Sequence, residues 1–498
     1  MNKAIEHGAS FLDDAADARL NLAGLLPESK IAGSELQPLF PGALTVDTHN
    51  PGDIRNGKVF AHMHRGALLF ARPMGRWFRW DGNRWAICLR GEEMEAAKAT
   101  ANSLISEASK VAMSDPDKGK RLFAHALQTQ NLPRLKAMIT LASSETGMVI
   151  GSTHELDSDA WLLGVQNGVV DLRTGALLKP DPKLLITKQA NAEYLSDAAC
   201  PHWMEFLDQI FSGDPETIES VQRLLGYTLT GMTTEEVIAI CLGFGSNGKS
   251  VFNNVTGNIM GEYFTVGPNC LLVARDKNDN SVRNDLAKLL GARLVSVNEL
   301  AAGARLDEQV IKQLAGREAI SARFLHKEFF DFMPTGKIWL RTNHRPIITG
   351  DDDGIWRRLV LIPFKRRFSE HERDIHLESK LLKERSAILS WMVRGAIKWQ
   401  QTGLFISPTI RAEINSYRTE SDLLGEFLED KTKAATGERV EQTDLFSNWK
   451  SWCETNGLKP GNKAGFTRKL AERRFTESKS NGRRFYQGLA LVSAQKGS

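Results

Sequence analysis

The chain has 498 residues, of which 42% are hydrophobic and 25% are charged. This is the composition of a globular protein with room for three or four domains, and no apolar run approaches the ~20 residues that a membrane-spanning helix needs. The net charge of +4 indicates little about partners, because acidic and basic residues nearly balance over the whole chain.

Two further features of the composition bear on location. Charged residues such as Glu6, Asp13 and Arg19 interrupt the N-terminal stretch, which therefore lacks the apolar core of a signal peptide. The five cysteines are scattered and include no Cys-x-x-Cys pair, which excludes a disulfide framework and argues against a zinc module. We therefore expect a cytoplasmic protein with no membrane partner.

Residues 1–200 are predicted to form an α+β accessory domain. Residues 80–85 are typical of a hairpin with its turn at Asp81-Gly82, residues 92–150 show helical spacing of apolar side chains, and residues 166–175 indicate a second hairpin. The sequence assigns no chemistry to this domain.

Residues 201–232 are predicted to form a helical collar. One short helix is expected over 203–211, and a second is capped by Asp214, begins at Pro215 and carries an apolar stripe. Both helices come directly before the strand that opens the next domain.

Residues 233–368 are predicted to form an α/β domain that hydrolyses a nucleotide, because they contain the pattern G-x-x-x-x-G-K-S. An apolar strand over 237–242 leads into this loop and an apolar helix pattern leads out of it, whereas a glycine-rich turn of chance composition is the alternative. The expected nucleotide-binding residues are Gly243, Phe244, Gly245, Ser246, Asn247, Gly248, Lys249, Ser250 and Val251. Glycines let backbone N–H groups turn toward phosphates, Lys249 would reach the β- and γ-phosphates of ATP, and Ser250 would bind Mg2+.

A second strand supplies the acid that hydrolysis requires. The apolar run 293–297 ends at Asn298 and Glu299, so Glu299 is our candidate for the general base and for contact with the metal. A carboxylate on the surface at the end of a strand is the alternative.

Two more groups follow in the chain. A third apolar strand ends at Asn343, whose amide could bind the γ-phosphate or the attacking water. Arg357 and Arg358 come next, and Arg358 is our candidate for a catalytic arginine donated to the site of a neighbouring subunit. Pairing of these arginines with the acidic run 351–353 is the alternative, and the sequence does not separate the two arginines.

The C-terminal part is divided into a helical extension over 369–420 and a winged-helix DNA-binding domain over 421–498. Residues 450–498 hold 11 Lys or Arg against 3 Glu, a local excess of +8. Two helices followed by a hairpin at Ser480-Asn481-Gly482 are typical of a winged helix. The expected DNA-binding residues are Arg468, Lys469, Arg473, Arg474, Arg483 and Arg484. A solvated basic face that contacts another subunit is the alternative.

The order of these motifs resembles the superfamily 3 helicases. Asn247 before Gly-Lys-Ser, the strand ending in Glu299, the segment 320–327, the Thr342-Asn343 strand end and the run Trp356-Arg357-Arg358 are similar to the phage and plasmid primase-helicases related to the poxvirus enzyme. The resemblance implies an AAA+-type core that uses ATP and Mg2+, a homo-hexameric ring, and movement along single-stranded DNA in the 3′ to 5′ direction.

The same resemblance implies a hairpin that touches DNA inside the ring. Residues 322–325 and 329–332 could be its two strands, with His326 and Lys327 at the tip, where a lysine can grip a phosphate and a histidine can stack on a base. A surface hairpin with one cation is the alternative.

Two departures from the family pattern stand out. Relatives outside this branch often carry two adjacent acids where this chain has Asn298 and then Glu299, so which group contacts the metal and which activates the water stays open. The sequence also shows neither a cysteine-based zinc motif nor an acidic metal cluster before the helicase motifs, so we expect any priming to reside on a separate primase.

The sequence thus predicts an ATP-driven replicative DNA helicase of a phage or mobile element, acting on single-stranded and forked DNA. Two other classes stay open. An origin-binding initiator would use ATP only to assemble, and a P-loop phosphotransferase would act as a monomer without DNA.

Overall fold

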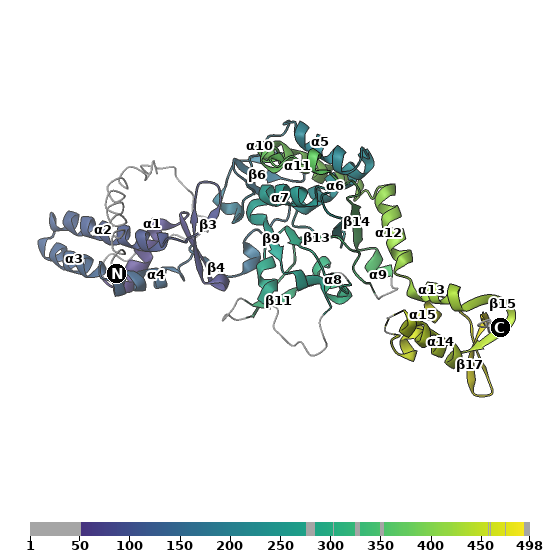
Figure 1. Ribbon diagram of the computed structural model, residues 1–498. Helices are drawn as coiled ribbons and strands as arrows, with labels where there is room; N and C mark the ends of the chain where they lie inside the picture. The colour runs from purple at the N-terminus through teal and green to yellow at the C-terminus, as the bar shows by residue number, and fades with distance from the viewer. Residues whose placement is uncertain are drawn as a thin grey trace, which may run out of the picture. The chain divides into compact units, whose positions relative to one another are not determined.

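The computed structural model describes residues 51–274, 284–301, 303–323, 329–348, 353–456, 458, 460–473 and 475–492. These residues form two compact units, one from residues 51–69 and 93–149, the other from residues 70–92 and 150–492. The ribbon in Figure 1 follows the chain from purple to yellow. None of the helices within these ranges combines the length and the hydropathy that crossing a membrane demands.

The first unit is helical, as the apolar spacing over 92–150 predicts. Its helices are α1 (Asp53–His64), α2 (Glu92–Ala112), α3 (Pro116–Thr129) and α4 (Leu132–Ala142). The Asp115 side chain caps α3 by accepting a hydrogen bond from the Lys118 backbone N–H. Helices α1 and α4 approach closely at Gly57, where an added Cβ would lie 2.8 Å from the Leu141 Cβ. A glycine is therefore required at this contact.

Short strands precede the large sheet, and those at the two predicted hairpins pair antiparallel, which confirms both hairpins. The strands are β1 (Leu68–Ala71), β2 (Arg76–Trp80), β3 (Trp85–Ile87), β4 (Val149–Ile150), β5 (Leu162–Val165), β6 (Gly168–Asp171) and β7 (Ala176–Leu178). They form one sheet in the order β3-β2-β1-β4 and another in the order β5-β6-β7. Gly82, at the turn between β2 and β3, has a φ of +100°, which side chains rarely adopt.

The centre of the second unit is a five-stranded sheet in the order β14-β8-β13-β10-β9, in which every pair of neighbours is parallel. The strands are β8 (Ile238–Leu242), β9 (Phe264–Gly267), β10 (Leu294–Val297), β13 (Lys337–Thr342) and β14 (Leu359–Pro363). Strands β8, β10 and β14 are buried along their whole length, as expected for strands covered on both faces. The predicted α/β class is confirmed.

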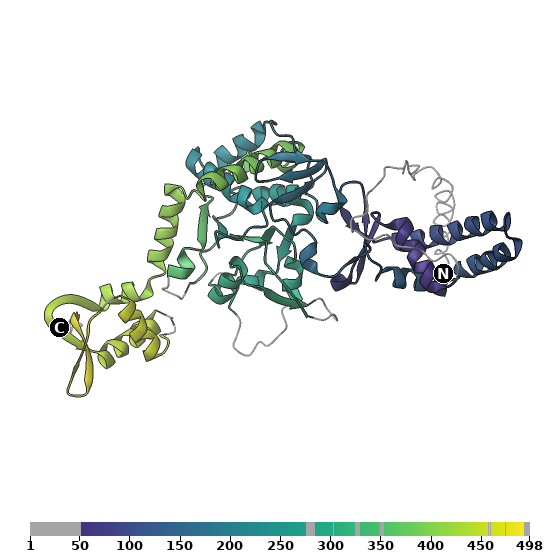
Figure 2. The ribbon, with the colours of Figure 1, turned by 180° about the vertical axis from the view of Figure 1, so that it is seen from behind.

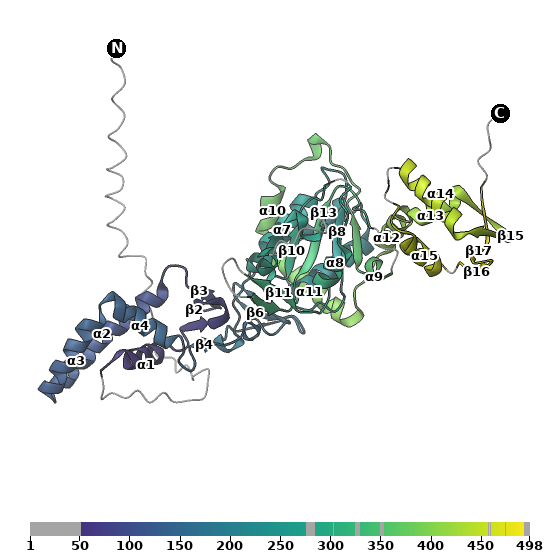
Figure 3. The same cartoon turned by 90° about the horizontal axis from the view of Figure 1, so that it is seen from below.

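The position of β8 in this sheet has a consequence for ligand binding. Strands that come later in the chain lie on both of its sides, with β14 on one and β13 on the other. Open parallel sheets bind ligands at such switch points, beyond the carboxyl ends of the strands. Figure 3 shows β8, β10 and β13 side by side, and their carboxyl ends meet at one edge.

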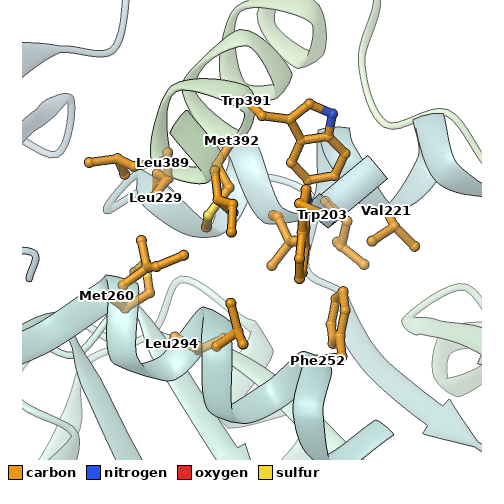
Figure 4. Packing of buried hydrophobic residues seen from close by; sticks show 14 of the residues in the cluster. Trp203, Val221, Leu229, Phe252, Met260, Leu294, Leu389, Trp391 and Met392 are labelled. Carbon is orange, nitrogen blue, oxygen red and sulfur yellow. The ribbon is translucent and has the colours of Figure 1, made fainter. Parts of the chain in front are cut away.

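One helical layer covers a face of this sheet. It contains α5 (Pro201–Ile210), α6 (Pro215–Leu229), α7 (Lys249–Met260), α10 (Leu377–Lys383) and α11 (Arg385–Thr402). The helix α12 (Pro408–Glu420) packs along the edge strand β14 and contributes side chains to the clusters on both faces. Trp203 lies between Phe252 and Trp391, with ring centroids 5.7 Å and 5.9 Å away (Figure 4). The predicted collar and the predicted helical extension thus share one core with the helix that follows the G-x-x-x-x-G-K-S loop.

The helices α6 and α11 cross closely because glycines face each other. A Cβ added to Gly226 would lie 2.0 Å from the Ala396 backbone nitrogen, and one added to Gly395 would lie 2.1 Å from the Gln222 carbonyl oxygen. Asp214 caps α6 as predicted, accepting hydrogen bonds from the backbone of Glu216 and Thr217.

A second cluster of buried hydrophobic residues packs on the other face of the sheet. The elements around this cluster include α8 (Glu308–Ala315) and α9 (Asp353–Trp356). A hairpin of β11 (Ile320–Arg323) and β12 (Phe329–Phe332) projects from this region, with Arg323 paired to Phe329. Phe324 and Leu325, the last two residues of the predicted first strand, lie outside the described residues. The expected tip residues, His326 and Lys327, lie outside the described residues.

Residues 423–491 form a small module around their own core (Figure 2). Its elements are α13 (Leu423–Lys431), β15 (Thr432–Glu441), α14 (Gln442–Thr455), α15 (Lys463–Glu472), β16 (Glu477–Ser480) and β17 (Arg483–Leu491). The two predicted helices and the predicted hairpin are confirmed, whereas β15, which makes the sheet order β15-β17-β16, was not foreseen. Several 3-10 turns complete the second unit: η2 (Arg72–Met74), η3 (Thr153–Glu155), η4 (Pro182–Leu184), η5 (Gly261–Tyr263), η6 (Asn269–Leu272), η7 (Asn284–Leu289) and η8 (Glu370–Glu372).

Candidate functional site

The loop between β8 and α7 has the backbone that a phosphate cradle needs. Gly245, Ser246 and Gly248 have φ values of +52°, +47° and +84°. Two of them are glycines, for which this conformation is not costly, and Ser246 adopts it against the usual preference of a side-chain-bearing residue. The loop leads directly into the N-terminus of α7, whose free N–H groups attract anions.

Gly248 is also confined by packing. A Cβ at this position would lie 2.6 Å from the Ile210 Cγ2 atom, so the last turn of α5 closes against the loop. Gly248 is therefore needed both for its φ and for its contact with the helical layer.

Lys249 begins α7 and turns back across the loop. Its Nζ donates to the Gly243 carbonyl oxygen and to the Asn343 Oδ1, the latter over 3.0 Å. The residue is only 7% exposed. Burial lowers the pKa of Lys249, and the nearby Glu299 carboxylate partly opposes this shift. A buried ammonium held by neutral oxygens is a favourable partner for an incoming anion.

Asn343 links Lys249 to the acid at the end of β10. The Asn343 Nδ2 donates to the Glu299 Oε1 over 2.9 Å, while its Oδ1 accepts from Lys249. These three residues come from separate strand ends, and they lie in one hydrogen-bonded chain because β8, β13 and β10 are parallel neighbours. The residues singled out from the sequence for phosphate, base and sensor roles are thus brought together.

A second polar network lies beside this chain and was not foreseen. The Arg341 guanidinium donates to the Asn298 Oδ1 from Nε over 3.1 Å and from Nη2 over 2.5 Å. The Ser296 hydroxyl donates to the Asn253 Oδ1 over 2.9 Å and so ties β10 to α7. Asn298 is therefore a hydrogen-bond acceptor for Arg341. The signal in the sequence was the place of Arg341 directly before Thr342-Asn343.

Oxygen ligands for Mg2+ are present at the same edge. The Ser250 hydroxyl is exposed at the start of α7 and the Glu299 carboxylate is exposed at the end of β10. Hydroxyl and carboxylate oxygens suit Mg2+, which keeps several water ligands when it binds a triphosphate. This donor set fits the metal that the sequence analysis expects.

A cavity of about 640 Å³ opens beside the loop. Residues 246–251 form one wall, α5 contributes residues such as Phe206 and Gln209, and a segment after β14 contributes Phe368 and Arg373. The Arg373 Nη2 donates to the Ser246 hydroxyl over 2.6 Å. Sequence reasoning missed these cavity residues, because neither segment carries a recognisable motif.

The two candidate arginines of the finger differ sharply. Arg358 is 9% exposed and donates to the Glu236 Oε2 and to the Gly354 carbonyl oxygen, each over 2.6 Å. The Arg357 side chain is 69% exposed. Both precede β14, so they lie at the amino end of the parallel strands, opposite to the loop, and neither can reach the loop of its own chain. The acidic residues 351 and 352, considered as their partners, lie outside the described residues.

The basic residues expected to bind DNA lie on two elements of the C-terminal module. Arg468 is exposed on α15, where Lys469 is half-buried, and Arg473, just after it, pairs with Asp422. On β17, Arg483 pairs with Glu441 over 3.0 Å and Arg484 approaches Glu477 at 3.9 Å. Arg474 lies outside the described residues.

Comparison with known families covers most of the chain. Residues 57–212 match the model "D5 N terminal like", residues 241–358 match a family of unknown function (DUF5906), and residues 419–487 match "Poxvirus D5 protein-like". The chain is 27% identical over 326 residues to "Putative helicase L207/L206" of Acanthamoeba polyphaga mimivirus. The first and third matched regions are therefore similar to parts of the poxvirus D5 protein and its relatives. The phosphate-cradling loop, Glu299 and Asn343 fall within the middle match.

Another viral relative matches a smaller part of the chain. "Putative helicase 184R" of Invertebrate iridescent virus 6 is 26% identical over 236 residues. The mimivirus match covers 61% of this chain and 34% of the relative, and the iridescent virus match covers 45% and 24%. This chain thus spans about a third or less of the length of these relatives. A structure of the NrS-1 C terminal region covers 87% of this chain and 98% of its own, at 11% identity and a TM-score of 0.47.

Proposed function

We propose that this chain is an ATP-driven DNA helicase with an AAA+-type core, and that it acts on single-stranded and forked DNA. The observation that supports this most is the hydrogen-bonded chain Lys249–Asn343–Glu299 at the carboxyl edge of the parallel sheet. It joins a phosphate-binding cation, a polar sensor and an acid, which are the groups that phosphoryl transfer to water requires. Helicase names among the D5-related relatives agree with this function.

Each residue has a part in hydrolysis. Lys249 and the loop backbone bind the β- and γ-phosphates of ATP, Glu299 accepts a proton from the attacking water, and Asn343 orients that water or the γ-phosphate. Ser250 and Glu299 would hold Mg2+, which would supply positive charge beside the phosphate oxygens. Asn343 donates a hydrogen bond to Glu299. Loss of the γ-phosphate would therefore alter the hydrogen bonding of the Glu299 carboxylate through Asn343.

The proposed domains follow from this site. Residues 233–368 are the ATPase domain, and the collar 201–232 and the extension 369–420 together form its helical layer. The strand order β14-β8-β13-β10-β9, with the phosphate-binding strand inside the sheet, is compatible with the AAA+ type. Residues 1–200 remain an accessory region in this proposal.

We assign residues 421–498 to a winged-helix domain. The order α13-β15-α14-α15-β16-β17 and the sheet order β15-β17-β16 support this assignment, because a strand before the last two helices and a hairpin after them is the winged-helix arrangement. In this arrangement α15 enters the major groove of duplex DNA and the hairpin contacts the backbone. Arg468 on α15 and Arg484 on the hairpin are then the residues closest to phosphates.

Replacing Arg468 and Arg484 by glutamate is expected to weaken duplex binding by at least about tenfold at moderate salt. The slope of log affinity against log salt should fall by about one for each phosphate that the variant no longer neutralises. Binding to a labelled duplex at several salt concentrations measures both quantities. Glu438→Gln, an exposed change on β15 that removes no cation, serves as the control. Unchanged affinity and slope in the double variant would rule out this DNA-binding face.

The proposed working state is a homo-hexameric ring. A ring explains two features of the single chain: the β11–β12 hairpin, whose tip residues His326 and Lys327 would grip a strand in the channel, and arginines at the edge opposite to their own loop. A neighbouring subunit can bring that edge to the loop. Because Arg358 is buried against Glu236, the exposed Arg357 is the better candidate for the arginine finger, which revises the choice made from the sequence.

Arg358→Ala is expected to reduce stability, whereas Arg357→Ala is expected to reduce ATP turnover. Loss of Arg358 removes the 2.6 Å hydrogen bond to Glu236, which keeps only the longer 3.9 Å approach of Arg357, and should lower the free energy of unfolding by about 1–3 kcal/mol. Loss of Arg357 should leave the melting temperature unchanged and reduce ATP turnover at least about 100-fold. Thermal unfolding and steady-state phosphate release separate the two effects. A fully active Arg357→Ala would exclude this residue as the finger.

The proposed function is tested with a forked duplex, ATP and Mg2+, measuring strand separation, phosphate release and the mass of the assembly. A helicase gives unwinding in the 3′ to 5′ direction and phosphate release that DNA stimulates. Release by a monomer without any response to DNA indicates a P-loop phosphotransferase, and ATP-dependent assembly with negligible release indicates an origin-binding initiator. Addition of a separate primase is not required for any of these outcomes.

A further inference from the structure

A segment after β14 runs along the phosphate-cradling loop and is fixed to it at several points. The Phe364 backbone N–H donates to the Leu242 carbonyl oxygen over 2.7 Å, and the Phe368 N–H donates to the Ser246 carbonyl oxygen over 2.8 Å. The Asn247 Nδ2 donates to the Phe364 carbonyl oxygen over 3.3 Å. Residues 364–373, which we call the strap, are therefore placed by the loop itself.

The strap ends in Arg373, whose guanidinium donates to the Ser246 hydroxyl over 2.6 Å and lines the cavity beside the loop. The two carboxylates next to Arg373 in the sequence form ion pairs with other residues. Glu372 pairs with Arg366 over 3.1 Å, and Asp374 pairs with Lys380 over 2.6 Å. Among the described residues Arg373 has no carboxylate partner. Its cation thus faces the cavity with only a neutral hydroxyl as partner.

This arrangement suits a phosphate better than a hydroxyl. A guanidinium forms shorter and roughly twice stronger hydrogen bonds with an anionic oxygen than with a neutral one, and it can bind phosphate with two parallel bonds. Arg373 is exposed, so it can leave the Ser246 hydroxyl without opening the core. The left-handed backbone of Ser246 holds this hydroxyl at the rim of the loop, where phosphates are expected.

We propose that Arg373 binds the phosphates of a nucleoside di- or triphosphate within its own subunit, exchanging the Ser246 hydroxyl for a phosphate oxygen when the nucleotide enters the cavity. The nucleoside occupies the part of the cavity between Phe206 of α5 and Phe368 of the strap. The site therefore has two phosphate-binding cations from one chain, Lys249 in the loop and Arg373 on the strap, in addition to the arginine supplied by a neighbour. This inference rests on the proposed nucleotide site and adds a ligand contact to it.

The test measures dissociation constants of ATP, ADP and adenosine for the full chain and its variants, by displacement of a fluorescent ADP. Arg373→Ala is expected to weaken the binding of ATP and ADP about tenfold or more, and the binding of adenosine less than twofold. Arg373→Lys should recover part of the loss. Arg367→Ala is the matched control, because Arg367 is an exposed arginine of the same strap that does not line the cavity. Matching melting temperatures show that each variant is folded.

The outcomes separate this inference from the proposed function. If wild type and Arg367→Ala bind ATP, Lys249→Ala does not, and Arg373→Ala binds like wild type, the nucleotide site stands and the role of Arg373 is overturned. An equal loss of affinity for adenosine and for ATP would show that Arg373 contacts the nucleoside, and it would overturn the proposed phosphate contact. If wild type binds no nucleotide, both the proposed function and this inference fail.

Discussion

Lys249→Ala is expected to abolish ATP hydrolysis and to weaken ATP binding at least about 100-fold. The ammonium is buried within the loop and is held by the Gly243 carbonyl oxygen and the Asn343 amide oxygen, and alanine offers no hydrogen-bond donor in its place. Hydrogen bonds to charged groups contribute about 1.5–3 kcal/mol each, and this lysine would make more than one to the β- and γ-phosphates. Phosphate release and displacement of a fluorescent nucleotide measure the two losses.

The fold should survive this change. Burial disfavours the charged form of Lys249 in the ligand-free chain, so its removal relieves a cost as well as losing two hydrogen bonds. We expect a melting temperature close to that of wild type. Lys179→Ala, which removes an exposed lysine far along the chain from the loop, is the control for the loss of one positive charge. Turnover at the wild-type rate in Lys249→Ala would refute the nucleotide assignment.

Glu299→Gln should separate binding from chemistry. The amide oxygen of glutamine can still accept the hydrogen bond from the Asn343 Nδ2, so nucleotide affinity should change less than about threefold. The amide cannot accept a proton, and the loss of a general base lowers turnover by about 10²–10⁴. A single-turnover assay of phosphate release, paired with equilibrium nucleotide binding, gives both numbers.

Glu318→Gln is the matched control, since Glu318 is an exposed glutamate that follows α8 and lies outside the site. It should behave like wild type in both assays. Near-normal hydrolysis by Glu299→Gln would show that another group activates water, and Glu299 would then be a surface carboxylate at the end of its strand.

Elements governed by local sequence were predicted well. Asp214 followed by Pro215 marked the start of α6, the glycines before Lys249 marked the turn from β8 into α7, and the spacing of apolar residues marked α14 and α15. In each case the deciding forces act within a few residues of the chain, namely capping, backbone freedom and a single buried face. The α/β class and the resemblance to helicases followed from the order of such elements.

The elements that were missed lack such local signals. Strand β15 is polar at most positions, contains Gly437 with a φ of +86° and changes register between Ala434 and Arg439, so it shows no regular alternation. It is ordered by pairing with β17, a partner more than forty residues later in the chain. Propensity carries little information about such a strand.

The sequence by itself determined which residue types are available: a G-x-x-x-x-G-K-S loop with Lys249, an acid at a strand end, and a basic C-terminal segment. Tertiary structure alone decided which groups meet. It placed Lys249, Asn343 and Glu299 in one hydrogen-bonded chain, buried Arg358 against Glu236, and brought Arg373 to the loop through the strap. The reason is physical: composition and spacing express forces along the chain, whereas strand order and close helix packing bring together residues that lie far apart in the sequence.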